Sequence, residues 1–236
     1  MADFSCIVVC EGSSDFSFIE GIIKHIGSLH NKVFEAILLA PEIDATSGKH
    51  QRFGYEGVKN WCKYQSSQFH NFGKNKVGSL LAWHDANLIL IHLDADIADK
   101  IDINQAQFNG RVKDRRNWCS DALDNWFGVL KDNINYNYII PTWQIETWLL
   151  ATFDNITNPV ESPVALTDYE TILDVESKLL SLGYREDLEK PGRLYKEKNL
   201  FATNSKYVPR LLANLPTATS RCSELLNFEN ILSGYC

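Results

Sequence analysis

The sequence predicts an α/β protein in which a mostly parallel sheet carries helices on both faces and is followed by a helical C-terminal extension. Two observations lead to this prediction. Over roughly the first 150 residues, short runs that are apolar on both faces alternate with amphipathic patterns of helix length. Beyond about residue 155 the strand patterns end, and the remaining apolar residues recur at helical spacing.

The strands account for the first observation. A strand that is apolar on both faces belongs in a sheet covered on both sides, because neither face can be left in water. The run SCIVVC is such a strand, and FEAILLA, which ends at Pro41, is a second. The four strands are expected at residues 5–10, 34–40, 88–93 and 138–140.

Helices are expected between and after these strands. In the first one, Phe16, Ile19, Ile22 and Ile26 recur every three or four residues, and Gly27 is a stop signal. The others are expected at residues 55–69, 117–131 and 143–153, and then at 169–182, 207–215 and 221–232. Pro159 and Pro163 indicate a linker, so we expect an α/β domain at residues 1–155 and a helical extension at 156–236.

The composition restricts the class of protein. The 236 residues carry a net charge of −7, whereas proteins that coat nucleic acid are usually basic. The acidic balance fits carboxylates neutralised by divalent cations, and it equally fits a protein without nucleic acid. Six cysteines include no CxxC pair, which indicates buried thiols in a reducing compartment. No apolar run reaches the roughly 18 residues of a membrane span, and MADFSC lacks a basic signal region, so we expect a cytoplasmic protein without membrane contact.

Three carboxylates follow the first and third predicted strands. Glu11 comes directly after SCIVVC, and Asp94 and Asp96 follow LILIHL. Residues two apart on an extended chain point the same way, and ligands of parallel sheets bind beyond the carboxyl ends of the strands. If the two strands are neighbours, all three side chains meet in one crevice. Carboxylate oxygens suit Mg²⁺ or Mn²⁺, although each acid taken alone is also an ordinary polar loop residue.

Three further polar residues have alternative interpretations. Glu146, inside the apolar segment WQIETWLLATF, is either an additional acid of the site or a solvent-facing residue of an amphipathic helix. For Asp15 we favour a role at the positive N-terminal end of the first helix over metal binding. For His92 we favour a core histidine over a metal ligand.

The segments VVCEGSSDFSFIEGI and LILIHLDAD together resemble the TOPRIM superfamily. That superfamily has a glutamate-glycine pair after the first strand, an acid a few residues on, and an Asp-x-Asp after a later strand. The segment IETWLLA also resembles small stand-alone TOPRIM-like prokaryotic proteins related to the nuclease part of the overcoming-lysogenization-defect (OLD) family. The resemblance covers roughly residues 5 to 152.

The resemblance implies a Rossmann-like parallel sheet, Mg²⁺ (or Mn²⁺) dependence and phosphodiester cleavage in DNA or RNA, often in anti-phage defence. It implies that Glu11, Asp94 and Asp96 are catalytic and bind the metal, with Glu146 as a further metal ligand. The chain departs from the pattern because no glycine follows the Asp-x-Asp closely. No topoisomerase tyrosine domain or primase zinc module is recognisable, so a nuclease is the favoured activity. The alternative is a non-catalytic sensor that acts with a partner protein of a defence system.

Two basic runs are candidates for contacting nucleic acid. The first contains Arg111, Lys113, Arg115 and Arg116, and it lies between the Asp-x-Asp and the next helix. The second contains Lys190, Arg193, Lys196 and Lys198, with Tyr195 among them as a ring on which a base can stack. For both runs we favour a solvated surface with local ion pairs, for example Arg115 with Asp114 or Asp121. The sequence does not determine the oligomeric state, and an oligomer is compatible with it.

Overall fold

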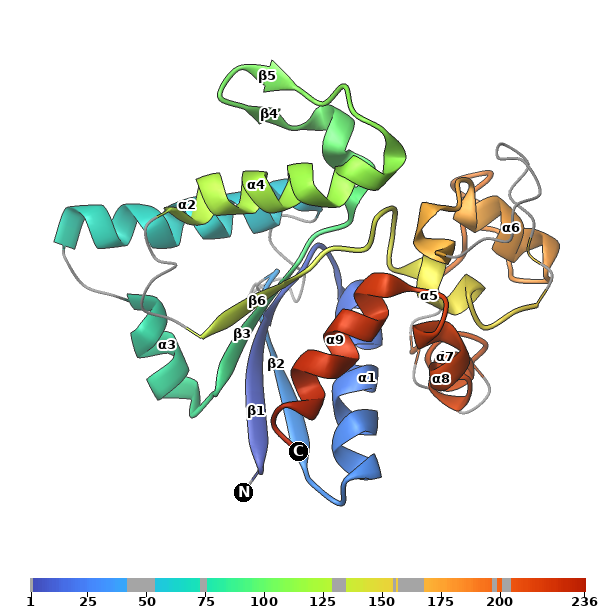
Figure 1. The fold of residues 1–236 in the computed structure, drawn as a ribbon, viewed down its shortest axis with the longest axis horizontal. Helices are drawn as coiled ribbons and strands as arrows, with labels where there is room; N and C mark the ends of the chain where they lie inside the picture. The colour runs from blue at the N-terminus through green and yellow to red at the C-terminus, as the bar shows by residue number, and fades with distance from the viewer. Residues whose placement is uncertain are drawn as a thin grey trace.

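The computed structural model of the chain describes residues 2–41, 54–72, 76–128, 135–154, 156, 168–196, 199–200 and 205–236. At its centre lies a parallel sheet of four strands in the order β2-β1-β3-β6 (Figure 1). The predicted α/β class with a mostly parallel sheet is therefore confirmed. The strands are β1 (Phe4–Val9), β2 (Phe34–Ala40), β3 (Leu88–His92) and β6 (Tyr136–Ile139).

The two central strands are buried on both faces, as their apolar runs predicted. Successive side chains of a strand point to opposite faces, so each central strand supplies two cores. In β1, Cys6 and Val8 belong to one core, whereas Ile7 and Val9 belong to the other. All six residues of β1 and all five of β3 are buried.

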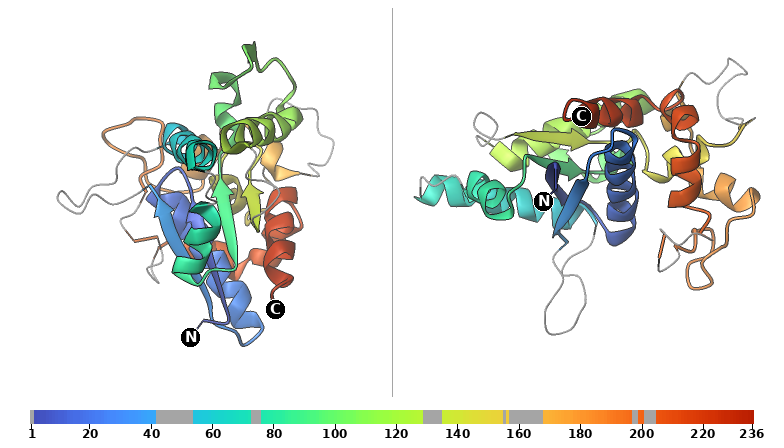
Figure 2. Two further views of the ribbon diagram at one scale, coloured as in Figure 1. Left: turned by 90° about the vertical axis from the view of Figure 1, so that its left-hand side faces the viewer. Right: turned by 90° about the horizontal axis from the view of Figure 1, so that it is seen from below.

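The first core lies under helices from both ends of the chain. It is covered by α1 (Ser13–Leu29) and by C-terminal helices whose apolar residues pack on the same face. Figure 2 shows α1 and the C-terminal helix on one side of the sheet. The other helices near this core are α5 (Glu146–Leu150), α6 (Val175–Ser181), α7 (Val208–Ala213), α8 (Leu215–Thr219) and α9 (Ser223–Ser233).

The second core lies under helices from the middle of the chain. These are α2 (Tyr55–Phe72), α3 (Lys76–His84) and α4 (Arg115–Phe127). A small antiparallel hairpin of β4 (Asp102–Ile103) and β5 (Ala106–Gln107) stands beside α4 and is seen at the top of Figure 1. Short 3-10 helices complete the described elements: η1 (Ala95–Lys100), η2 (Val112–Asp114) and η4 (Tyr169–Thr171).

The C-terminal helices are part of the sheet's own core. Leu225, Phe228 and Leu232 of α9 are buried in the same cluster as Phe4 and Leu88 of the strands. The ring of Tyr235 lies 4.3 Å, between centroids, from that of Phe4, so the two termini lie side by side (Figure 1).

Several element predictions need correction. Residues 169–182 are not one helix, because Asp174 has a left-handed backbone (φ 55°) that separates η4 from α6. The helix expected at 143–153 is only the five residues of α5. Helix α3 and the β4–β5 hairpin were not predicted. Pro159, Pro163 and the predicted end of the helix at 117–131 lie outside the described residues.

Among the helices that the structure describes, none combines the length and apolar character needed to cross a bilayer.

Candidate functional site

Glu11 and Asp94 meet where β1 and β3 end. The two strands are paired in parallel, which confirms the expectation that they are neighbours. Oε1 of Glu11 accepts a hydrogen bond of 2.9 Å from the backbone N of Asp94. Gly54 fixes the same turn from outside, since its N donates to the Glu11 carbonyl at 2.9 Å. The first carboxylate is therefore held against the backbone that carries the second.

Asp94 also joins β3 to the segment that leads into α5. Its Oδ1 accepts a hydrogen bond of 2.9 Å from Ile145 N and lies 3.2 Å from Nε2 of His92. His92 is fully buried, as predicted, but it is not a satisfied core histidine, because neither ring nitrogen forms a hydrogen bond within the described residues and Nε2 faces Asp94. The carboxylate of Asp94 thus lies at the junction of three chain segments.

Glu146 is buried, and the solvent-facing interpretation of this residue is wrong. Its side chain is 1% exposed, and it forms an ion pair with the ammonium group of Lys196. The first turn of α5 directs it inward, next to the segment that holds Asp94. A buried carboxylate needs such a partner, because an uncompensated charge in the interior is costly.

Asp15 belongs to the same cluster. It lies in the first turn of α1, as predicted, and is only 5% exposed. Ser14 Oγ lies 3.3 Å from Asp15 Oδ1 and also 3.3 Å from Lys196 Nζ, so the serine links the two charged groups. The predicted position of Asp15 at the start of the helix is confirmed, whereas nothing in the sequence indicated that it lies beside the other carboxylates.

Asp96 lies at the edge of this cluster, in η1. Its N donates to the Trp143 carbonyl at 2.9 Å, which fixes the turn after β3. Its side chain is half-buried, and it feels the positive charges of Lys100, Arg193 and Arg115 together with the negative charge of Glu146. Asp94 and Asp96 therefore lie in the same acidic cluster, and the side chain of Asp96 is the less buried of the two.

The carboxylates oppose one another's ionisation. Burial, followed by the charge of Asp94, raises the pKa of Glu11 well above its ordinary value. Burial, followed by the charges of Asp15, Glu146 and Asp96, likewise raises the pKa of Asp94. Burial also raises the pKa of Asp15. Additional positive charge at this site would therefore be stabilising.

Lys196 supplies positive charge to the acidic site. Burial alone would raise the pKa of Glu146, but the charge of Lys196 and its hydrogen bond outweigh burial and lower it. Conversely, burial would lower the pKa of Lys196, but Glu146 and Asp15 raise it above its ordinary value. The lysine is therefore held in its charged form.

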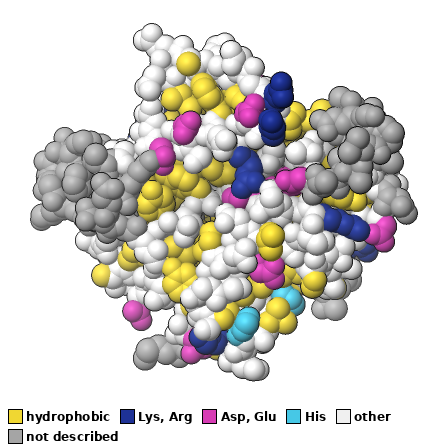
Figure 3. All heavy atoms as spheres, in the orientation of Figure 1, with side chains coloured by type: hydrophobic (Ala, Val, Ile, Leu, Met, Phe, Trp, Pro, Cys, Tyr) yellow, Lys and Arg dark blue, Asp and Glu magenta, His cyan; other side chains and the backbone are white. Residues whose placement is uncertain are grey.

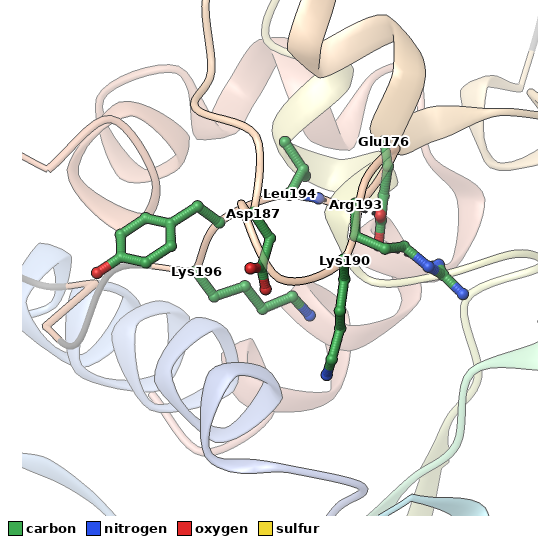
Figure 4. Close-up of a pocket in the computed structure, with 7 residues that line it drawn as sticks. Glu176, Asp187, Lys190, Arg193, Leu194 and Lys196 are labelled. Atoms are coloured by element: carbon green, nitrogen blue, oxygen red, sulfur yellow. Dashed lines mark hydrogen bonds and ion pairs between the residues drawn. The ribbon is translucent and has the colours of Figure 1, made fainter.

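Lys196 comes from the second basic run, which the sequence placed on a solvated surface. It lines a cavity of ≈ 500 Å³ together with Lys190, Arg193 and Tyr195. In Figure 4 the side chains of Lys190 and Lys196 converge on one side of this cavity, whereas the Arg193 guanidinium points away from them. Arg193 is ion-paired with Glu176 at 3.3 Å. Lys198 lies outside the described residues.

The first basic run is divided between the interior and the surface. Arg115 is buried, donates to the carbonyl of Ala95 at 3.1 Å and pairs with Asp99, which is neither of the partners expected for it. Arg116 pairs with Glu224 of α9 and so ties α4 to the C-terminal helix. Arg111 and Lys113 are exposed. The proposal that this run binds nucleic acid therefore depends on its first two members.

The donor atoms of the site fit a hard divalent cation in type. Glu11 and Asp94 each use one carboxylate oxygen for a backbone hydrogen bond, which leaves their second oxygens open within the described part of the chain. Carboxylate oxygens are what Mg²⁺ and Mn²⁺ prefer, and added positive charge would favour the ionised form of these two acids, whose pKa values are raised by burial and by neighbouring carboxylates. In the ranges that the structure describes, however, no three acidic, histidine or cysteine side chains are arranged as a ready metal shell. A cation held by three or more of these side chains would therefore require them to move.

The surface around the site carries mixed charge. On the face shown in Figure 3, Lys and Arg side chains lie at separate points among Asp and Glu, and the described atoms form no continuous basic surface there. This distribution agrees with the net charge of −7.

Comparisons of the chain with protein-family models, with curated proteins and with solved structures found no match.

Proposed function

We propose that the chain hydrolyses phosphodiester bonds in DNA or RNA with the help of a divalent cation, on a Rossmann-like sheet of TOPRIM type. One observation carries the proposal: the hydrogen bond from Asp94 N to Glu11 Oε1 joins the acids that follow two neighbouring parallel strands. That edge is where open parallel sheets bind their ligands. A cytoplasmic role in prokaryotic anti-phage defence belongs to the proposal through the TOPRIM resemblance.

The residues that would hold Mg²⁺ or Mn²⁺ are Glu11, Asp94, Asp96 and Glu146. When bound, the cation supplies Lewis acidity that favours deprotonation of the attacking water and neutralises charge on the phosphate. Glu11 has one open oxygen, Oε2, because its Oε1 is held by Asp94 N, and that oxygen would either bind the cation or accept the proton of the water. The water oxygen bonds to phosphorus, the ester P–O bond breaks, and the leaving oxygen takes up a proton.

Lys196 positions the substrate in this scheme. Its ammonium group is paired with the buried Glu146 and its side chain also lines the cavity of Figure 4, so it can face a phosphate anion in that cavity. A phosphate drawn to Lys190 and Lys196 would thereby be brought to the acidic cluster.

The test uses plasmid DNA, linear DNA and RNA with Mg²⁺, with Mn²⁺ and with EDTA. We expect cutting that EDTA abolishes, and a loss of at least on the order of 100-fold in the Asp94→Asn/Asp96→Asn variant, because both amides lack the negative charge. The matched control is Asp121→Asn, an exposed carboxylate on α4, which should cut like the parent. Equal cutting by parent and double variant would show that the site is misassigned.

A non-catalytic sensor is the second candidate, and two observations favour it. Lys196 already compensates Glu146, and the described residues present no ready metal shell. Such a protein would bind a cation or a partner protein at the same crevice without cutting. Cation binding measured by calorimetry, without cleavage of any of the three substrates, would support this candidate over the enzyme.

A further inference from the structure

A second cavity lined by basic side chains lies across the acidic site from the cavity of Figure 4. It has a volume of ≈ 330 Å³ and is formed by the first half of α2, the end of α4 and the β4 strand. We call it the lysine pocket, and its principal residues are Tyr55, Lys59, Lys63, Lys100, Asn104 and Trp126.

The lysine pocket offers positive charge that the fold uses only in part. Lys59 is paired with Glu56 at 3.1 Å, and its ammonium group lies 5.8 Å from the ring centres of Tyr55 and Trp126. Lys63 and Lys100 are exposed, and neither is ion-paired with a carboxylate in the part of the chain that the structure describes. Asp102 is the other acid that lines the pocket. Two exposed ammonium groups without an ion pair, in a pocket that also contains aromatic rings, suit a ligand that carries phosphate groups.

Two chain segments connect the lysine pocket to the acidic site. Gly54 is bonded to the Glu11 carbonyl, and the next residue, Tyr55, lines the pocket. On the second segment, η1 begins directly after Asp94 and ends at Lys100. The lysine pocket is therefore linked to Glu11 through the hydrogen bond of Gly54, and to Asp94 through the single short helix η1.

The two basic cavities flank the acids. In Figure 1, α2, α4 and the hairpin lie on one side of the sheet's carboxyl edge, whereas α6 and the segment after it lie on the other. Asp96 feels both sides, since Lys100 of the lysine pocket and Arg193 of the cavity in Figure 4 both stabilise its charge.

We propose that the lysine pocket binds the phosphate backbone of a single-stranded segment of the substrate, on the side of the scissile bond opposite to Lys196. The inference rests on the proposed function, because the acidic site defines the bond to be cut. Basic side chains beside aromatic rings are the combination with which proteins bind single strands. A strand held on both sides of the acids is cut at internal bonds, so the substrate must continue in both directions.

The test measures binding of a labelled single-stranded oligonucleotide, as DNA and as RNA, by fluorescence anisotropy in EDTA at several salt concentrations. The slope of log K against log salt is negative, and each lost phosphate contact reduces its magnitude by about 0.7 for single strands. In the Lys63→Ala/Lys100→Ala variant the magnitude of the slope should therefore fall by about 1.4, and binding should be on the order of 10-fold weaker at about 0.1 M salt. Lys63→Arg/Lys100→Arg should keep the slope, because both charges remain. The matched control is Lys24→Ala, an exposed helical lysine on α1.

The outcomes separate this inference from the proposed function. Lost strand binding in the double alanine variant supports the pocket even if the parent cuts nothing, in which case only the proposed function fails. Unchanged binding and slope overturn the inference even if the parent cuts. Inorganic phosphate that displaces the strand at equal concentration would also overturn it, because the ligand would then be a free phosphate compound. Circular dichroism melting confirms that each variant is folded.

Discussion

The ion pair between Lys196 and Glu146 has a consequence for stability that a single substitution can measure. In Lys196→Met the nearly fully buried Glu146 loses its partner, so we expect the free energy of unfolding at neutral pH to fall by about 3 kcal/mol. Urea unfolding measures this loss. Lys196→Arg should restore most of it, and Lys190→Met, in the same cavity, should cost little.

The sign of the pH dependence follows from Glu146. Its pKa is lowered in the folded state by Lys196, so the stabilisation is present above the ordinary glutamate value and disappears as the pH falls through the folded value. The difference between parent and Lys196→Met should therefore shrink under acid conditions. A difference that stays constant from neutral to acid pH would contradict this assignment.

Glu170 should show the opposite pH dependence. This residue of η4 is fully buried and accepts a hydrogen bond of 2.7 Å from Trp148 Nε1. Its Oε2 accepts a second hydrogen bond from the backbone N of Glu224, in the first turn of α9. Burial, followed by the charge of Asp168, raises its pKa to about 7. The unfolded chain then loses this proton before the folded chain does, so stability falls as the pH rises from about 4.5 to about 7.

The Glu170→Gln variant tests this pH dependence. The glutamine cannot ionise, so the decline, which amounts to ~3 kcal/mol at most for this group, should be absent in the variant. Urea unfolding at pH values on either side of the transition, for parent and variant, measures it. Parallel pH profiles of the two proteins would contradict the assignment.

Among single residues, the acids at the strand ends were predictable and the lysine was not. Glu11, Asp94 and Asp96 follow strands whose apolar runs are legible, so their meeting requires only that two strands be neighbours. Lys196 reaches Glu146 across fifty positions of chain, and no pattern in that stretch indicates that its two ends meet. The basic run around it was a visible signal, but it is equally typical of a solvated surface.

At the scale of elements, the contact between α1 and β2 depends on the absence of a side chain at Gly27. A Cβ there would lie 2.7 Å from Cγ of Phe34 and 2.9 Å from the Lys32 carbonyl. Gly27→Ala should therefore destabilise the fold by roughly 1–3 kcal/mol, because the turn after α1 must shift. Thermal unfolding measures the loss, and Ser28→Ala, its exposed neighbour, is the control. A melting temperature unchanged from the parent would contradict the packing described here.

Elements were predictable where one pattern dominated. The long apolar runs of β1, β2 and β3 and the regular spacing in α1 gave bounds within a residue or two. The β4–β5 hairpin has two residues in each strand, too few for a period to be recognised. The predicted helix at 169–182 failed because nothing in its apolar spacing marks the left-handed backbone at Asp174.

At the scale of the whole molecule, α9 should be indispensable. Leu225, Phe228 and Leu232 are buried against the sheet, and each buried side chain of this kind contributes about 1.5–3 kcal/mol. Their sum is comparable to the total stability of a typical protein, which is about 5–15 kcal/mol. Removal of residues 222–236 should therefore abolish cooperative unfolding and expose apolar surface that binds the dye ANS. A truncated chain with the parent's urea midpoint would contradict this role of α9.

The order of synthesis gives the position of Lys196 a further meaning. Ribosomes deliver the chain from its amino end, so Glu11, Asp15, Asp94, Asp96 and Glu146 emerge well before Lys196. Until Lys196 has been added, these acids lack their natural counter-charge. The crevice can therefore reach its finished electrostatic state only after Lys196 has been synthesised, which withholds any activity of that crevice from chains that end before this residue.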